Sequence, residues 1–262
     1  MPHAHVNGQR LFYQDSGGNH PALLFSHGLL MDHAMFAPQV AAFRDRYRCI
    51  AWDERGHGQT AGDSIAPFSY YDSADDAAAL LRHLGIEQAV LIGMSQGGYL
   101  SQRVALRHPQ VVRALVLIDT QSGPEDATKM PGYLAMIDDW CRNGLSEQTA
   151  TIIEQIILGN GWNGAAEWRA KWATWQPHNL AACFATLGER DDISESVRAI
   201  RAPTLAIHGA DDVAISVARA QAMVDAIPGA RLEVIPGAGH AANLTHPEAV
   251  NPLIDAFLQQ LP

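Results

Sequence analysis

Short apolar runs alternate along this chain with segments whose apolar residues recur at helical spacing. Runs of strand character occupy residues 10–14, 22–26, 47–53, 89–94, 111–119, 203–209 and 230–235. Helical spacing is found at residues 36–43, 73–84, 99–107, 217–226 and 247–260. This alternation predicts an α/β fold with a mostly parallel, doubly wound sheet that carries helices on both faces.

The rhythm breaks over residues 122–200, where helical segments follow one another without clear buried strands. We therefore predict a helical insertion at 122–200 in a core made of residues 1–121 and 201–262. Trp168, Trp172 and Trp175 fall on one helical face, which favours packing over substrate contact. Trp140 and Trp162 lie off that stripe and are the better candidates for lining a pocket.

The chain has a net charge of −10, so it lacks the basic surface that nucleic acids or anionic membranes would need. No apolar run reaches the roughly 18 residues of a membrane span, and we expect neither a signal peptide nor a membrane partner. Cys49, Cys141 and Cys183 are far apart and lack metal-ligand spacing. We predict no disulfides, no metal site and a cytoplasmic location.

Candidate chemistry begins at the sequence Gly93-Met94-Ser95-Gln96-Gly97, which separates a predicted strand from a predicted helix. A serine on such a sharp turn projects its hydroxyl away from the sheet. The backbone N–H of Gln96 then lies at the helix N-terminus, where it can stabilise negative charge on an attacked carbonyl. Ser95 is therefore the predicted nucleophile.

A serine hydroxyl needs a base, and the base needs a carboxylate to orient it. His240 follows the last predicted strand in a glycine-rich loop and is the predicted base, with His246 as an alternative. Asp212 is the preferred acid because its loop follows the strand just before the histidine strand. Asp119, at the end of an earlier strand, and the adjacent Asp211 remain alternatives.

Five segments together resemble the α/β-hydrolase superfamily over nearly the whole chain. They are His27-Gly28, residues 53–58 (Asp-Glu-Arg-Gly-His-Gly), residues 93–97, residues 209–212 (Gly-Ala-Asp-Asp) and Gly239-His240. Within the superfamily the chain is similar to an esterase and lactonase branch. This branch includes β-ketoadipate enol-lactonases and cofactor-free haloperoxidases that act as esterases and perhydrolases. His27 and His57 are expected to support the site without reacting.

The resemblance implies that backbone N–H groups of Leu29 and Gln96 form an oxyanion hole, and that the helical insertion is a cap over the pocket. We expect Leu30 to contact substrate together with the two cap tryptophans named above. The implied substrate is a small carboxylic ester or lactone, cleaved without a metal or organic cofactor. The oligomeric state stays open, with a homodimer as one option.

Other activities fit the same three catalytic residues. A cofactor-free dioxygenase, a perhydrolase or a carbon–carbon bond hydrolase would use them, and a non-catalytic ligand receptor could keep the fold without turnover. A dehalogenase is disfavoured because it uses a carboxylate at the position of Ser95. Labelling by a fluorophosphonate, combined with a panel of esters and lactones, discriminates between these alternatives.

Overall fold

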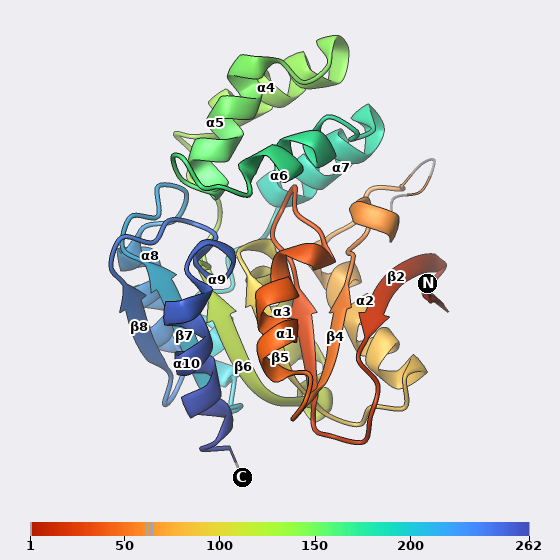
Figure 1. Cartoon of the computed structure of the whole chain (residues 1–262), viewed down its shortest axis with the longest axis vertical. Coiled ribbons are helices and arrows are strands. Elements are labelled where there is room, and N and C mark those ends of the chain that lie inside the picture. Colours follow the sequence, from red (N-terminus) through yellow and green to blue (C-terminus); the bar gives the residue numbers. More distant parts are fainter. Residues whose placement is uncertain (1, 61, 63–64, 262) are drawn as a thin grey trace.

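Eight strands form one sheet in this computed structural model, which describes residues 2–60, 62 and 65–261. Their order is β1-β2-β4-β3-β5-β6-β7-β8 (Figure 1). The strands are β1 (His3–Val6), β2 (Gln9–Asp15), β3 (Ala22–Ser26), β4 (Arg48–Trp52), β5 (Ala89–Met94), β6 (Val112–Ile118), β7 (Thr204–Gly209) and β8 (Arg231–Ile235). β2 pairs antiparallel with β1 and β4, and the other neighbours pair in parallel. The predicted α/β fold class is confirmed.

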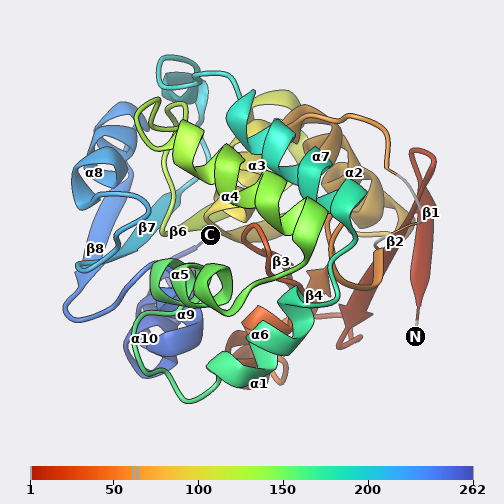
Figure 2. The same ribbon diagram turned by 90° about the horizontal axis from the view of Figure 1, so that it is seen from above.

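Helices cover both faces of the sheet, as Figure 2 shows. One face carries α2 (Tyr70–His83), α3 (Gln96–Arg107) and α8 (Val217–Ala226), and the other carries α1 (Ala37–Phe43) and α10 (Pro247–Leu258). Because the sheet is covered on both sides, every residue of β3, β5 and β7 is buried. No helix in the described part of the chain is long and apolar enough to cross a bilayer.

Four α-helices occupy residues 122–200, where the alternation of strands and helices is interrupted. They are α4 (Met130–Asn143), α5 (Glu147–Ile157), α6 (Ala165–Trp172) and α7 (Pro177–Gly188), and they lie beyond the carboxyl ends of the parallel strands (Figure 1). Two contacts join α6 to the loop after β3. The Trp172 indole donates to the Leu30 carbonyl over 3.0 Å, and Lys171 pairs with Asp32 at 2.9 Å. Trp168 and Trp172 are both buried, as expected for packing residues.

Three features differ from the sequence prediction. β1 was not predicted, because it is a four-residue strand without an apolar run. The helix predicted from residue 73 begins at Tyr70, where Ser69 and Asp72 form a capping box. The short helix α9 (Ala242–Thr245) follows the histidine loop directly and was also missed. None of these differences moves the predicted strand ends that carry the candidate chemistry.

The approach of α3 to the sheet depends on two glycines. A Cβ at Gly93 would overlap the carbonyl of Gly97, and a Cβ at Gly97 would overlap the carbonyl of Ser26 on β3. These neighbours are backbone atoms, so they cannot rotate away as side chains could. The absence of a side chain at both positions therefore allows the turn that carries Ser95.

We expect Gly97→Ala to lower the free energy of unfolding by about 2 kcal/mol or more, because α3 must move away from β3 to admit the methyl group. Gly132→Ala is the matched control. Its added methyl group would meet no atom within 4 Å, and it lies inside helix α4, where alanine is preferred. Urea denaturation monitored by circular dichroism measures both variants, and equal stability of the two would contradict the close-packing account.

Candidate active site

Ser95 lies between β5 and α3 with backbone angles φ 49° and ψ −112°, a region that side chains with a Cβ rarely adopt. Its amide donates to the Ile118 carbonyl of β6 over 2.9 Å, which ties the turn to the sheet. The serine is 7% exposed and lines a cavity whose opposite wall comes from α4, α5 and α7. Strain of this kind persists only where the surroundings hold it, and it is concentrated at functional sites.

His240 lies between Ser95 and Asp212. Its Nε2 is 3.0 Å from Ser95 Oγ, and its Nδ1 donates to Asp212 Oδ2 over 2.8 Å. These contacts assign Nδ1 as protonated and leave Nε2 as the acceptor for the serine proton. The alternative base, His246, instead has Nδ1 2.9 Å from the hydroxyl of Thr245 at the start of α10.

The Asp212 carboxylate is fully buried and held on several sides. Its Oδ1 accepts from the amides of Ala214 and Ile215, and His208 Nε2 lies 3.3 Å from Oδ2. Burial alone would raise the pKa of Asp212, but the charge of His240 and these hydrogen bonds lower it well below its usual range. Burial in turn opposes protonation of His240, yet the Asp212 charge outweighs it and raises the His240 pKa.

Asp119 and Asp211 lie nearby but take different positions. Asp211 is exposed. Asp119 is buried at the end of β6, where its oxygens accept from the amides of Gly209 at 2.7 Å and Ala242 at 3.0 Å. Burial and the nearby Asp212 charge raise the pKa of Asp119 to about 7. Asp119 thus binds the backbone of the two loops that carry Asp212 and the histidine, and it makes no hydrogen bond to the imidazole.

The backbone amides of Leu29 and Gln96 find no acceptor among the described residues. The Gln96 side chain lies between two groups, donating to the Glu54 carboxyl and accepting from the Tyr70 hydroxyl at 3.1 Å. Burial raises the pKa of Glu54 to about 8. Residue Leu30 has a φ of 65°, which turns the loop sharply after Leu29. Both amides therefore come from strained or buried turns beside the cavity.

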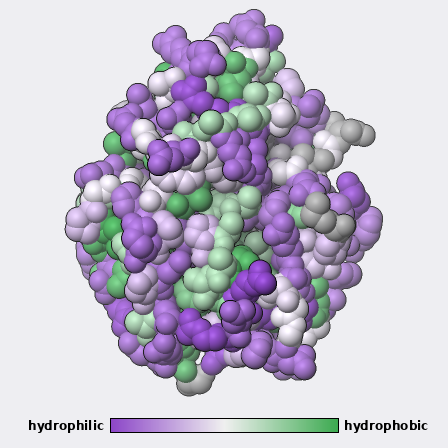
Figure 3. Space-filling view, in the orientation of Figure 1, coloured by the Kyte–Doolittle hydropathy of each residue, from purple (hydrophilic) through white to green (hydrophobic). Residues whose placement is uncertain are grey.

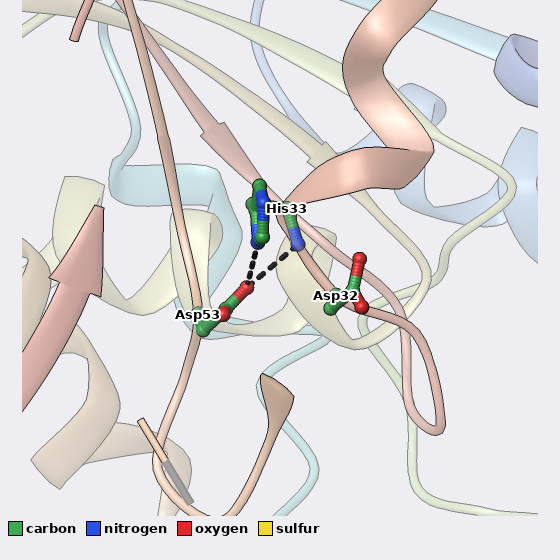
Figure 4. Close-up of side chains that lie close together, drawn as sticks. All are labelled: Asp32, His33 and Asp53. Atoms are coloured by element: carbon green, nitrogen blue, oxygen red, sulfur yellow. Dashed lines mark hydrogen bonds and ion pairs between the residues drawn. The ribbon is translucent and has the colours of Figure 1, made fainter. Parts of the chain in front are cut away.

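The loop after β3 is held by Asp53, as Figure 4 shows. Asp53 Oδ1 accepts from both the amide and Nδ1 of His33 at 2.7 Å, and its other oxygen accepts from the Gln59 amide at 2.8 Å. Asp32 is not joined to this pair by a dashed line, and its carboxylate binds Lys171 of α6. One buried carboxylate therefore connects the loops after β3 and β4.

His27 and His57 support the same two loops. His27 donates from Nδ1 to the Gly28 carbonyl and accepts at Nε2 from the Glu54 amide. The His57 ring packs on His27 with 4.8 Å between centroids. Burial lowers the pKa of His57 to about 3 and also lowers that of His27, so both rings are neutral near pH 7. These histidines connect loops, in the supporting role expected of them.

Two groups of side chains each bring together three residues of metal-binding type, two aspartates and one histidine. They are Asp32 with His33 and Asp53, and Asp119 with His208 and Asp212. In both groups the carboxylates already accept from amides, imidazoles or Lys171. We assign neither group as a metal site, because protein donors occupy these oxygens.

The cavity beside Ser95 is walled mainly by apolar side chains from α4, α5 and α7, three of the four helices that lie beyond the strand ends. They include Met136 of α4, Ile153, Ile156 and Ile157 of α5, and Phe184 and Leu187 of α7. Leu30, which was predicted to contact substrate, also lines the cavity. Trp140 and Trp162, the predicted pocket tryptophans, are not among its lining residues. Figure 3 shows a mostly hydrophilic outer face with a smaller hydrophobic group near its middle.

Sequence reasoning also missed a charged pair at the cavity. Glu125 lines it, and Arg190 donates to Glu125 over 2.6 Å while its guanidinium lies 3.8 Å from the Tyr99 ring centroid. These residues come from three separate segments. The helical spacing of Tyr99 from Ser95, one turn further along α3, was the only local signal of this arrangement.

Comparison with known proteins gives a consistent set of similarities. A family model described as alpha/beta hydrolase fold matches residues 21–152, and one described as TAP-like protein matches residues 170–261. The chain is 28% identical to 3-oxoadipate enol-lactonase 2 of Acinetobacter baylyi, over 92% of this chain and 89% of that protein. It is also 28% identical to a non-heme haloperoxidase of Rhodococcus erythropolis, over 97% of each.

Solved structures resemble the chain over almost its full length. The enol-lactonase from Burkholderia xenovorans superposes with a TM-score of 0.90 at 25% identity, covering 99% of this chain and 100% of that one. A thermophilic esterase from Thermogutta terrifontis gives a TM-score of 0.87 at 27% identity, covering 99% and 97%. The family predicted from the sequence motifs is thus confirmed.

The geometry predicts how His240 titrates. Its pKa should lie above the ordinary value of 6.5, because the Asp212 charge favours the imidazolium. Asp212→Asn should lower that pKa by about one pH unit or more. Asp211→Asn is the control, since Asp211 is exposed and the change should leave the titration in place. NMR titration of the imidazole measures all three proteins; an unchanged pKa in Asp212→Asn would contradict the assignment.

Proposed function

We propose, from the premise that this chain belongs to the α/β-hydrolase family, that it is a serine hydrolase of carboxylic esters or lactones. Ser95 is the proposed nucleophile, His240 the general base and Asp212 the carboxylate that orients it. The observation that carries this proposal is the pair of contacts of His240, 3.0 Å to Ser95 Oγ and 2.8 Å to Asp212, beside an apolar cavity. The similarity to esterases and enol-lactonases favours acyl transfer over the other activities of the fold.

In the first step Ser95 Oγ attacks the ester carbonyl while its proton passes to His240 Nε2. The carbonyl electron pair moves to oxygen, and the amides of Leu29 and Gln96 would hold the resulting oxyanion. Collapse of this intermediate breaks the ester bond, and the leaving alkoxide takes the proton from His240. Asp212 stabilises the imidazolium throughout and stays ionised, as its lowered pKa indicates.

In the second step a water molecule attacks the acyl-enzyme. His240 removes its proton, the bond to Ser95 Oγ breaks, and the serine recovers its proton from the imidazole. The products are a carboxylic acid and the free enzyme. For a lactone the alcohol stays attached to the acyl group, so only one product leaves.

Residues 122–200 are proposed to act as a cap on a core of residues 1–121 and 201–262. Support comes from the position of α4, α5 and α7 at the cavity and from the contacts of α6 with the loop that carries Leu29. A cap of this kind excludes water and shapes the pocket. We also place the protein in the cytoplasm, because its three cysteines are free.

Ser95→Ala should abolish ester hydrolysis while the circular dichroism spectrum stays unchanged. Losing the nucleophile should reduce kcat by about 10⁴-fold or more. A fluorophosphonate should label the wild type and leave the variant unlabelled. Retention of a tenth of wild-type activity on its best ester would show that Ser95 is not the nucleophile.

The three candidate carboxylates should respond differently when changed to asparagine. Asp212→Asn should lower kcat by about 10⁴-fold, because the imidazole loses both its tautomer control and its counter-charge. Asp119→Asn should lose one backbone contact, and its kcat should stay within about tenfold of the wild-type value. The kcat of Asp211→Asn should match that of the wild type. Measuring kcat of all three variants on one ester decides the assignment. If Asp119→Asn has the severely reduced kcat, the carboxylate that orients His240 is Asp119, at the end of β6.

A further inference from the structure

The charge of the cavity walls indicates which esters can enter. Among the described residues that line the cavity, none is a lysine or an arginine. Apart from His240, the ionisable groups of the lining are two tyrosines and Glu125. The rest of the wall above Ser95 is isoleucine, leucine, methionine and phenylalanine from α4, α5 and α7. A substrate carboxylate would therefore lose its water without meeting a cationic partner.

Arg190 contacts the lining residue Glu125, but each of its three nitrogens already donates to a protein oxygen. Its Nε and Nη2 donate to the Gly123 carbonyl at 3.0 and 2.7 Å, and its Nη1 donates to Glu125. Its side chain is 1% exposed and does not line the cavity, whereas Glu125 is 12% exposed and does. The pair is thus oriented with its carboxylate toward the cavity and its guanidinium away from it.

We propose that this site, acting as the proposed ester hydrolase, selects uncharged substrates with an apolar group and rejects substrates that carry a carboxylate. Two effects act in the same direction. The apolar wall favours an alkyl or aryl group, and Glu125 repels a second carboxylate brought into the same low-dielectric space. Glu125 is therefore a specificity-determining residue that acts against one class of ligand.

Matched substrates separate charge from size. On the acyl side, p-nitrophenyl hexanoate is compared with p-nitrophenyl mono-adipate, and the methyl ester of the latter serves as an uncharged control of the same length. On the alcohol side, hexyl acetate is compared with 6-acetoxyhexanoate. In one of the two pairs the group that varies occupies the cavity. In that pair the substrate with a carboxylate should have a kcat/KM about 30-fold or more below that of its uncharged partner.

A lysine placed in the wall should reverse part of this selectivity. Met136→Lys adds a cation on α4 within the lining, and we expect the charged-to-neutral ratio of kcat/KM to rise by about tenfold or more. Leu134→Lys is the matched control, because it adds the same charge to the same helix at a position that is 51% exposed and outside the lining. Its ratio should stay within about twofold of the wild type.

Glu125→Gln gives a second, independent change. It removes the carboxylate and leaves the Arg190 guanidinium as the uncompensated charge behind the wall, so the same ratio should rise. If this variant fails to fold because Arg190 loses its partner, Met136→Lys and the wild-type substrate pairs still test the proposal.

The outcomes distinguish the inference from the function on which it rests. Correctly folded protein that hydrolyses no ester in the panel contradicts the proposed function. Hydrolysis of both members of each pair at rates within about tenfold contradicts the inference alone. The inference is also overturned if Met136→Lys leaves the charged-to-neutral ratio of kcat/KM unchanged. The same holds if Leu134→Lys raises that ratio as much as Met136→Lys does.

Discussion

The close packing of α3 against β3 and β5 is the constraint on which the site depends. Because Gly93 and Gly97 have no side chains, the backbone atoms of α3 and β3 can approach closely, and a single residue joins β5 to α3. The turn residue is Ser95, held at φ 49° by the hydrogen bond that its amide donates to the Ile118 carbonyl of β6 and by the start of the helix. The same turn exposes the hydroxyl and directs the first amide of α3 toward it, so nucleophile and oxyanion donor have one structural origin.

Buried carboxylates place the remaining groups around this turn. Asp119 binds amides of the two loops that carry Asp212 and His240, and Asp53 binds the loop that carries Leu29. The amides bound by Asp119 are 90 and 123 residues away along the chain, and the His33 amide bound by Asp53 is 20 residues away, so each bond joins separate segments. The carboxyl edge of the sheet is thus a set of loops cross-linked by side chains, and the catalytic proposal depends on their rigidity.

Features that depend on the local order of residues could be predicted from the sequence. Features that depend on the direction in which a side chain points could not. Strand ends, the serine turn and the histidine loop follow from hydrophobic spacing and glycine positions, and they lie where expected. Chain position favoured Asp212 but could not exclude Asp119, because the two residues follow neighbouring parallel strands; the direction of the side chains distinguishes them. The pocket wall was missed for a similar reason. Trp140 was predicted to line the pocket because it lies off the stripe of the other tryptophans, but a sequence pattern does not show which neighbours bury a side chain.

The central claim is that substrate is carried covalently on Ser95. The most direct measurement is mass spectrometry of enzyme quenched by acid during turnover of an activated ester, followed by peptide mapping. The account predicts a mass increase equal to the acyl group, located on the peptide that contains Ser95, which appears before product reaches steady state. An acyl group carried on a residue other than Ser95 would contradict the account.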